Sequence, residues 1–421
     1  MAERVAIFPG GRRRPVMHCS PAIRCGPFVF TSGQTATDWE VGRPPDTNLP
    51  HLGDSVRVEV RRAFGNLRDT IEAAGLTLFD VSRVDNYYTS RFMTAGHFAA
   101  RDEYYTIDPM EKPASTAVMV RRFVPEGCRY AVEGIAIDAP RESLVTDKVQ
   151  RSPGRLPMGI RAGDFVFLSG RMASDYREGL APEARTPSWI WIGSPIHAQT
   201  EYVLAMHRDI LEAGGLSLRD IVKSEVFLRD PRDITGLDEV WQAFFPEDPP
   251  ARSLFVVDDM AIPDAVVEIN HIALHPESRL NRTTIATVNA PMPLFYEPQG
   301  VKVGPLVFLS TQVAHDEDGL ARKAQPDPEF PHVGSRGRLQ TKTILENVAA
   351  ICEAAGGSLA DVAKVQTHLT DLAEFDAVNE VWKHSFDVAP AWTVVELSRD
   401  TLAIEGSTMM CDVIACIANE A

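Results

Sequence analysis

The segment FVFTSG at residues 28–33 recurs as FVFLSG at residues 165–170 and as LVFLST at residues 306–311. Each copy is a short run of aromatic and β-branched residues that begins two positions after a glycine, a pattern typical of a strand entered through a tight turn. The sequence therefore contains one strand three times. The three glycines are Gly26, Gly163 and Gly304.

A second block fixes the period of the repeat. EAAGLTLFDV at residues 72–81 returns as EAGGLSLRDI and as EAAGGSLADV, and the aspartates of the three blocks are 140 and 141 residues apart. A Pro-Ala pair follows in every copy, in the same order. Blocks in constant order at one period indicate tandem units. We place the units at residues 1–142, 143–280 and 281–421.

Each unit reads as the same succession of elements. The first strand is followed by an amphipathic helix that ends at Gly75, Gly215 or Gly356, as expected of glycine after a helix. The aspartate of the second block lies in the turn that leads into another strand. A second helix and two closing strands follow this strand. We expect these second strands at 82–89, 223–228 and 364–369, and the last strands at 132–137, 266–274 and 410–417.

The order ββαβαββ predicts an α+β unit with one sheet and both helices on a single face. Strands such as 301–309 are apolar almost throughout, which indicates burial on both faces. Three sheets that face inward, with the helices outside, would bury them. We therefore predict a closed pseudo-threefold arrangement, a pseudo-trimer made by one chain.

Composition narrows the classes of function. The formal net charge is −16, which disfavours nucleic acid as a partner, and no stretch is apolar enough for a membrane helix. The first residues lack a signal-peptide pattern, and the six cysteines form no CxxC pair. We expect a cytoplasmic protein with reduced, mostly buried thiols. Association of the chain into larger homo-oligomers stays open.

Several motifs together resemble the RidA (YjgF-like) family, whose units fold like chorismate mutase. They are Ser32-Gly33-Gln34, the run at 361–364 (DVAK), the run at 375–382 (FDAVNEVW), the run at 250–253 (PARS) and the run at 267–273 (VEINHIA). The resemblance extends over residues 15 to 418. It implies trimers with a site at each interface, where many members hydrolyse reactive enamines or imines to a keto acid and ammonia.

The resemblance also implies two catalytic groups. An arginine holds the substrate carboxylate through its planar fork, and a glutamate places and polarises the attacking water. Only the second unit keeps both, as Arg252 and Glu268. The arginine position of the other units holds Ser115 and Trp392. Their glutamate position is matched to Ala131 in the first unit and to Asp412 or Val413 in the third.

The remaining family residues fall in the third unit. The family tyrosine matches Tyr296, where the other units have His18 and Arg155. The family asparagine survives as Asn379, with Asp102 and Asp238 as its counterparts. We therefore expect one surviving site at the interface of the second and third units. Its catalytic residues would be Glu268, Arg252 and Tyr296, and its substrate-binding residues Asn379, Ser169, Gly170, Ser310 and Trp392.

Three functions remain open. The first is a RidA-like deaminase or related hydrolase that acts on a small nitrogen compound with a carboxylate. The second is a specialised pathway hydrolase on the same scaffold, chorismatase-like or ring-opening. The third is a non-catalytic ligand-binding protein. We expect no cofactor, since no Gly-rich phosphate loop follows a strand, and no metal, since histidine pairs such as His197 and His207 lack a third ligand.

Overall fold

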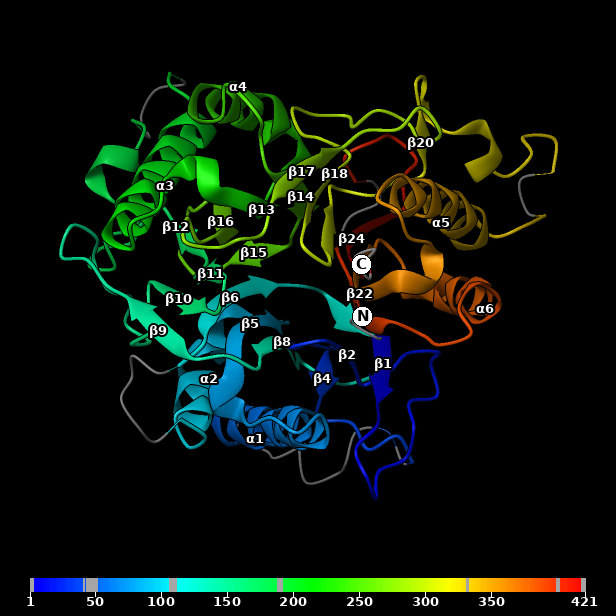
Figure 1. Cartoon of the computed structure of the whole chain (residues 1–421), viewed down its shortest axis with the longest axis horizontal. Coiled ribbons are helices and arrows are strands. Elements are labelled where there is room, and N and C mark those ends of the chain that lie inside the picture. Colours follow the sequence, from blue (N-terminus) through cyan, green and yellow to red (C-terminus); the bar gives the residue numbers. More distant parts are fainter. Residues whose placement is uncertain are drawn as a thin grey trace.

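Three units surround a common centre in the computed structural model (Figure 1). The structure describes residues 4–40, 42, 52–105, 112–187, 192–330, 333–398 and 402–417. Each unit contributes one sheet to the interior and two helices to the outside, so the predicted ββαβαββ units are confirmed. No helix in these ranges combines the length and apolar character needed to cross a bilayer.

The sheet of the first unit has the strand order β1-β2-β3-β8-β5-β6. β5 and β6 are parallel, and β8 is antiparallel to both β3 and β5. The strands are β1 (Arg4–Ile7), β2 (Ala22–Cys25), β3 (Phe28–Thr31), β4 (Gln34–Thr35), β5 (Val81–Tyr88), β6 (Ala114–Met119), β7 (Arg122–Phe123) and β8 (Tyr130–Ile137).

The second and third units repeat this order as β9-β10-β11-β16-β13-β14 and β17-β18-β19-β24-β22-β23. The second unit has β9 (Arg141–Leu144), β10 (Gly159–Ala162), β11 (Phe165–Leu168), β12 (Arg171–Met172), β13 (Ile221–Leu228), β14 (Ala251–Val256), β15 (Asp259–Met260) and β16 (Val267–Leu274). The third unit has β17 (Arg282–Ile285), β18 (Gly300–Val303), β19 (Leu306–Leu309), β20 (His315–Asp316), β21 (Gly319–Leu320), β22 (Val362–Leu369), β23 (Ala391–Glu396) and β24 (Met409–Cys416).

Short strands of one unit pair with the sheet edge of a neighbouring unit. β15 of the second unit pairs with β6 of the first, and β7 of the first unit pairs with β23 of the third. The extra first strands β1, β9 and β17 were not expected from the sequence. They are partly exposed edge strands of four residues. β9 and β17 are mostly polar, and β1 is too short for its apolar residues to form a recognisable strand pattern.

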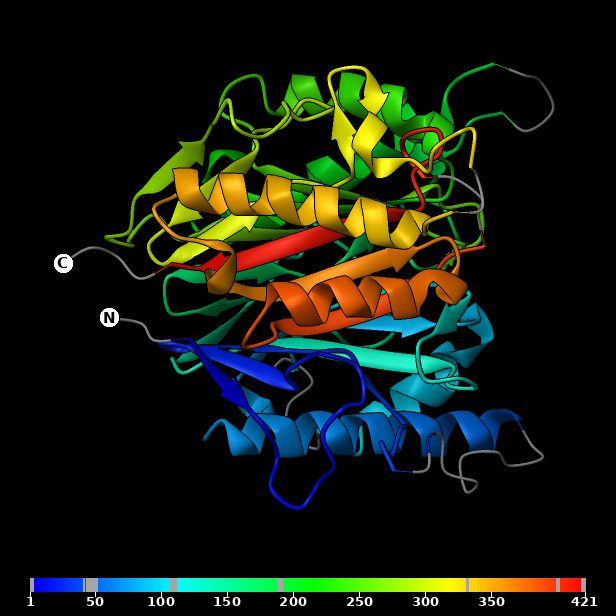
Figure 2. The same ribbon diagram turned by 90° about the vertical axis from the view of Figure 1, so that its right-hand side faces the viewer.

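Two helices cover the outer face of each sheet: α1 (Leu52–Ala73) and α2 (Thr94–Arg101), α3 (Pro195–Ala213) and α4 (Ile234–Phe244), α5 (Arg336–Ala354) and α6 (Phe375–Ser385). Figure 2 shows α5 and α6 running along the outside of their strands. In α5 the buried residues Ile344, Leu345, Val348 and Ile351 have the spacing of one helix face. The glycines after the long helices adopt positive φ, which ends each helix.

The repeated aspartate has a local structural role. The carboxylate of Asp80 accepts hydrogen bonds from the backbone N–H and the hydroxyl of Thr77, at 2.7 and 2.9 Å. Asp220 and Asp361 do the same for Ser217 and Ser358. These bonds hold the turn between the long helix and the following strand, which explains why this aspartate marks the repeat.

Two apolar cores are shared by all three units. At one, Phe28, Phe165 and Phe308 meet near the centre of the molecule. The other contains Phe227, Phe255 and further residues from each unit. Between these cores lies a buried ionic layer in which three cations meet four carboxylates. Its pairs are Arg83 with Asp85 and Glu225, Lys223 with Asp412, and Lys364 with Glu133.

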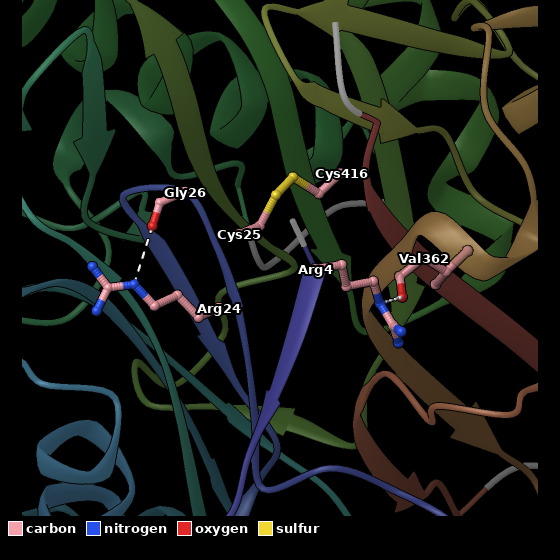
Figure 3. Close-up of a disulfide and its surroundings, with 6 residues drawn as sticks. All are labelled: Arg4, Arg24, Cys25, Gly26, Val362 and Cys416. Atoms are coloured by element: carbon pink, nitrogen blue, oxygen red, sulfur yellow. Dashed lines mark hydrogen bonds between the residues drawn. A yellow bond between two sulfur atoms is a disulfide. The ribbon is translucent and has the colours of Figure 1, made fainter. Parts of the chain in front are cut away.

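A disulfide joins Cys25 of β2 to Cys416 of β24 across the junction of the first and third units (Figure 3). The other four cysteines are buried and belong to no disulfide within the described ranges. The expectation that all thiols are reduced is therefore wrong for this pair. Its partners are 391 residues apart in sequence and meet because the third unit closes onto the first. The expected cytoplasmic location stays a prediction, and a disulfide is uncommon there.

Candidate functional site

One contact recurs at all three interfaces between units. The backbone N–H of the residue at the family arginine position donates to a serine hydroxyl of the next unit. The pairs are Ser115 with Ser169 (3.1 Å), Arg252 with Ser310 (3.1 Å) and Trp392 with Ser32 (2.8 Å). Each hydroxyl in turn donates to a carbonyl twelve residues before it in sequence. The repeated Ser of the SG or ST motif therefore joins the units at equivalent places.

The eight predicted site residues divide among these three interfaces. Glu268, Ser169 and Gly170 lie where the first and second units meet. Arg252, Tyr296 and Ser310 lie between the second and third units, and Asn379 and Trp392 between the third and first. The prediction that one interface brings them all together is wrong.

Sheet geometry explains why Arg252 and Glu268 are apart. Arg252 on β14 and Glu268 on β16 lie on opposite sides of β13, paired with Ser224 and Phe227 respectively. They are thus two strand spacings apart, about 10 Å, and three residues apart along the strands, again about 10 Å. Each residue faces a different neighbouring unit.

At the interface of the second and third units, Arg252 is fully buried and already bound. Its Nε donates to Glu297 at 2.8 Å, and Nη2 binds Asp238. Its guanidinium lies 4.9 Å from the centre of the Trp241 ring. Tyr296 completes this cluster, because its N–H donates to Asp238. The arginine has protein carboxylates where a substrate carboxylate would bind.

The register of the strands also corrects the glutamate position of the third unit. Phe227 pairs with Glu268, and the equivalent pairs are Tyr87 with Ala131 and His368 with Met410. The match of Ala131 agrees with this register. The equivalent of Glu268 in the third unit is Met410, not Asp412 or Val413. The interface of the second and third units therefore lacks the acid.

At the interface of the third and first units, aromatic rings fill the arginine position. Trp392 stacks on Trp382 with ring centres 4.3 Å apart, and its Nε1 donates to Thr367. Asn379 accepts a hydrogen bond from the backbone N–H of His18 at 2.9 Å. The space left there is small, about 50 Å³. These residues serve packing and the joining of the units.

The interface of the first and second units contains a larger cavity of about 160 Å³. Its polar lining includes Glu268, Arg171, His97 and Ser152. Each of these side chains has a buried polar atom without a hydrogen-bond partner among the described residues: Glu268 Oε2, Arg171 Nε, His97 Nε2 and Ser152 Oγ. Buried polar groups are normally paired, so their gathering around one cavity indicates a ligand site. The remaining walls include Tyr88, Phe98, Leu156, Met172, Tyr176, Ala261 and Ile262.

Glu268 is the acid of this cavity. Burial raises its pKa to about 8, although a hydrogen bond from the backbone of Ala117 acts in the opposite direction. The carboxyl group is therefore largely protonated at neutral pH. Gly170 makes room for it, because a Cβ atom at this position would overlap Glu268 Oε1 and approach Thr116. Ser169 and Gly170 thus bind the backbone of Ser115 in the opposing unit, and Gly170 leaves space for the acid.

His97 contributes a neutral imidazole. Its Nδ1 is hydrogen-bonded to the Tyr88 hydroxyl at 2.6 Å, while Nε2 is unpaired. Burial, assisted by the charge of Arg101, lowers the pKa of His97 well below its ordinary value. The ring can accept or donate one hydrogen bond at the cavity without carrying charge.

Sequence comparison of the units missed part of this site. Asn379 and Asp238 are the fifth residues of α6 and α4, and the fifth residue of α2 is Phe98. The assignment of Asp102 as their counterpart is therefore wrong, and an aromatic wall stands in its place. Arg171 was also missed, although it replaces the glutamine of the Ser-Gly-Gln motif. That replacement is the one signal in the sequence that could have revealed it.

In the part of the chain that the structure describes, no three His, Cys, Asp or Glu side chains are grouped as metal ligands would be.

The sequence profile described as "Endoribonuclease L-PSP" matches residues 11–138, 150–275 and 288–405. A RutC family protein of Pyrococcus horikoshii is 32% identical over 134 residues, which are 32% of this chain and 97% of the relative. Reactive Intermediate Deaminase A, chloroplastic, of Arabidopsis thaliana is 31% identical over 138 residues, 33% of this chain and 68% of the relative.

Among solved structures, a chorismatase is similar over most of the chain. It covers 80% of this chain and 93% of its own, with a TM-score of 0.53 and 13% identity, and so supports the fold alone. The three profile matches account for most of the sequence and coincide with the three units. The chain therefore belongs to the endoribonuclease L-PSP family, to which its RidA-like motifs point, and contains three copies of the family unit.

Proposed function

We propose that the chain is a deaminase or related hydrolase, which acts on a small imine or enamine that bears a carboxylate. The reaction takes place in the cavity between the first and second units. The observation that carries the proposal is Glu268, a buried acid with a raised pKa and an unpaired oxygen at a cavity of small-molecule size. At the interface of the second and third units, Arg252 is bound by two carboxylates and Met410 stands at the position of the acid, so this interface does not support the same reaction.

Protonated Glu268 can begin the hydrolysis by donating its proton to the imine nitrogen. Water then adds to the carbon of the C=N bond, and the glutamate carboxylate takes the proton that this water loses. Glu268 next donates this proton to the amino group of the resulting carbinolamine, and the C–N bond breaks to release ammonia. The hydroxyl group gives its proton to the glutamate carboxylate, so the carbon keeps its oxygen as a ketone and the acid is restored. No electrons are exchanged, so no redox partner is needed.

Two further observations support this function over one on RNA. The Arabidopsis relative is named as a reactive intermediate deaminase. The net charge of −16 and a cavity of about 160 Å³ favour a small molecule over a polyanion, whose binding relies on basic surfaces. The word endoribonuclease in the family description is therefore not carried over to this chain.

A second candidate is a specialised pathway hydrolase for an aromatic substrate. It is favoured by Phe98, Tyr88 and Tyr176, which line the cavity, with Phe98 at the position of the family asparagine. The same acid would then protonate a different leaving group. Turnover of imines and turnover of aromatic ring substrates separate the two candidates.

The test is an imine hydrolysis assay. An amino acid oxidase generates the imine in place, and semicarbazide competes with the protein for it, so faster hydrolysis lowers the yield of semicarbazone. We expect the wild type to lower this yield and Glu268→Gln to lose at least about 100-fold in kcat, the usual contribution of a general acid.

Glu277→Gln is the matched control, because this glutamate is exposed and pairs with Arg161 on the surface. It should behave as the wild type. Equal turnover by Glu268→Gln and wild type would overturn the proposed acid. A wild type that accelerates no imine hydrolysis would overturn the proposed reaction.

A further inference from the structure

Arg171 differs from every other buried arginine among the described residues. Arg83 binds Asp85 and Glu225, Arg101 binds Asp102, and Arg252 binds Asp238 and Glu297. The side chain of Arg171 is just as buried, with 1% of its surface exposed, yet within the described ranges no carboxylate lies in ion-pair distance. A buried charge without a counter-ion is strongly unfavourable, so a protein retains one where a ligand supplies the opposite charge.

The surroundings of Arg171 orient the guanidinium without neutralising it. Nη1 donates to the Gln150 carbonyl at 3.1 Å and to the Tyr176 hydroxyl at 3.5 Å, while Nε has no partner. The neighbouring histidine does not compensate, since burial and the charge of Arg171 lower the pKa of His207 to about 3. The cavity therefore presents one positive charge opposite a protonated Glu268.

The other two units show that the fold does not need this charge. Gln34 and Gln312 occupy the same place after the SG or ST pair. Their side-chain amides turn back onto the carbonyls of Ser32 and Ser310, at 3.0 and 2.9 Å. A neutral amide is thus sufficient for the structure, and the arginine of the second unit has some other role.

We propose that Arg171 is the anchor for the carboxylate of the ligand in the cavity between the first and second units. It takes over the task of the family arginine, whose position there holds Ser115. The anchor has moved from one unit to its neighbour across the same interface. A guanidinium with free donors holds a carboxylate through parallel, charge-assisted hydrogen bonds. The inference rests on the proposed function only for the reaction that follows binding.

The cavity also sets the size of the ligand. A volume of about 160 Å³ is close to the space in which a protein can bind benzene, which is about 150 Å³. The ligand is therefore a carboxylate attached to a group no larger than one ring. Phe98 and Tyr176 offer flat apolar walls to such a group.

The experiment compares two probes of equal shape, benzoate and benzamide, with pyruvate as a smaller carboxylate. Binding is measured by titration calorimetry on the full chain at neutral pH. We expect the wild type to bind benzoate or pyruvate at least tenfold more tightly than benzamide. Arg171→Gln, which installs the residue of the other units, should reduce the affinity for the carboxylates at least tenfold and leave that for benzamide unchanged.

Arg161→Gln is the control, because this arginine belongs to the same unit and pairs with Glu277 on the surface. Equal benzoate affinity in wild type and Arg171→Gln, or no carboxylate binding by the wild type, would overturn the proposal. The Glu268→Gln variant separates the carboxylate anchor from the catalytic acid, because it should lose turnover and retain its affinity for benzoate. If Arg171→Gln loses benzoate while the wild type hydrolyses no imine, the anchor stands and the proposed reaction fails.

Discussion

The interfaces on either side of the second unit use the same backbone contact but differ in how their charges are satisfied. Between the second and third units, Arg252 is bound by Glu297 and Asp238. Between the first and second, Arg171 and Glu268 leave polar atoms unpaired around a cavity. A family motif residue such as Arg252 can thus become structural, while Arg171, which replaces a motif glutamine, keeps an unpaired nitrogen at a cavity. The match to a motif therefore does not by itself say whether a buried charge is satisfied within the protein.

The largest expected effect concerns the ion pairs of Arg252 between the second and third units. Arg252→Ala leaves the buried carboxylate of Glu297, whose pKa burial already raises, without its main partner. We expect the free energy of unfolding to fall by about 3–5 kcal/mol, the usual result of removing one member of a buried pair. Urea unfolding followed by tryptophan fluorescence measures it. The double variant Arg252→Met with Glu297→Gln should recover most of the loss, and a single variant as stable as the wild type contradicts the pairing.

The next effect concerns Glu268, the buried acid at the interface of the first and second units. Because folding raises the pKa of Glu268 to about 8, the folded state favours its protonated form. Its stabilising contribution is complete below the unfolded pKa near 4.5 and is lost as pH rises through about 8. The stability of Glu268→Gln relative to wild type should therefore increase between pH 5 and 9, on the order of 3–4 kcal/mol. Unfolding curves at several pH values measure this difference, and a pH-independent one counts against a buried acid.

A third prediction concerns the seam between the first and third units, where the chain has no peptide connection. The Cys25–Cys416 disulfide closes this seam covalently. Replacing both cysteines by alanine should lower the free energy of unfolding by about 2–4 kcal/mol, since the disulfide restricts the unfolded chain. Unfolding with and without reductant measures it. The double alanine variant should no longer respond to reductant, and an equal response in both proteins contradicts the assignment.

The smallest effect sharpens the contrast between the two arginines. Arg171→Gln removes an unpaired buried charge, so without ligand it should raise the free energy of unfolding by about 1–2 kcal/mol. The same measurement on Arg161→Gln, an exposed ion pair, should show a change of no more than about 1 kcal/mol. A loss of stability in Arg171→Gln would mean that the arginine serves the fold.

Much of the fold followed from local patterns. The aspartates that gave the period close a turn with their own backbone neighbours, and the glycines end helices through positive φ. Such interactions span a few residues, so they leave a readable pattern. The site was predicted less well, because Asn379 was matched to Asp102 in place of Phe98 and Glu268 was matched to the wrong residue of β24. Alignment by residue type fails where function has diverged, since the residues that differ are the ones sought.

From the sequence we could predict the three units, most of their elements and part of the candidate site, namely Glu268, Ser169 and Gly170. The tertiary structure alone decided which of them meet. Arg252 and Glu268 belong to one unit, but β13 separates them and each faces a different neighbour. Cys25 and Cys416 lie near opposite ends of the chain and are bonded. Strand register and the closing of three sheets around one centre set these contacts, and both depend on packing between residues that are far apart in the sequence.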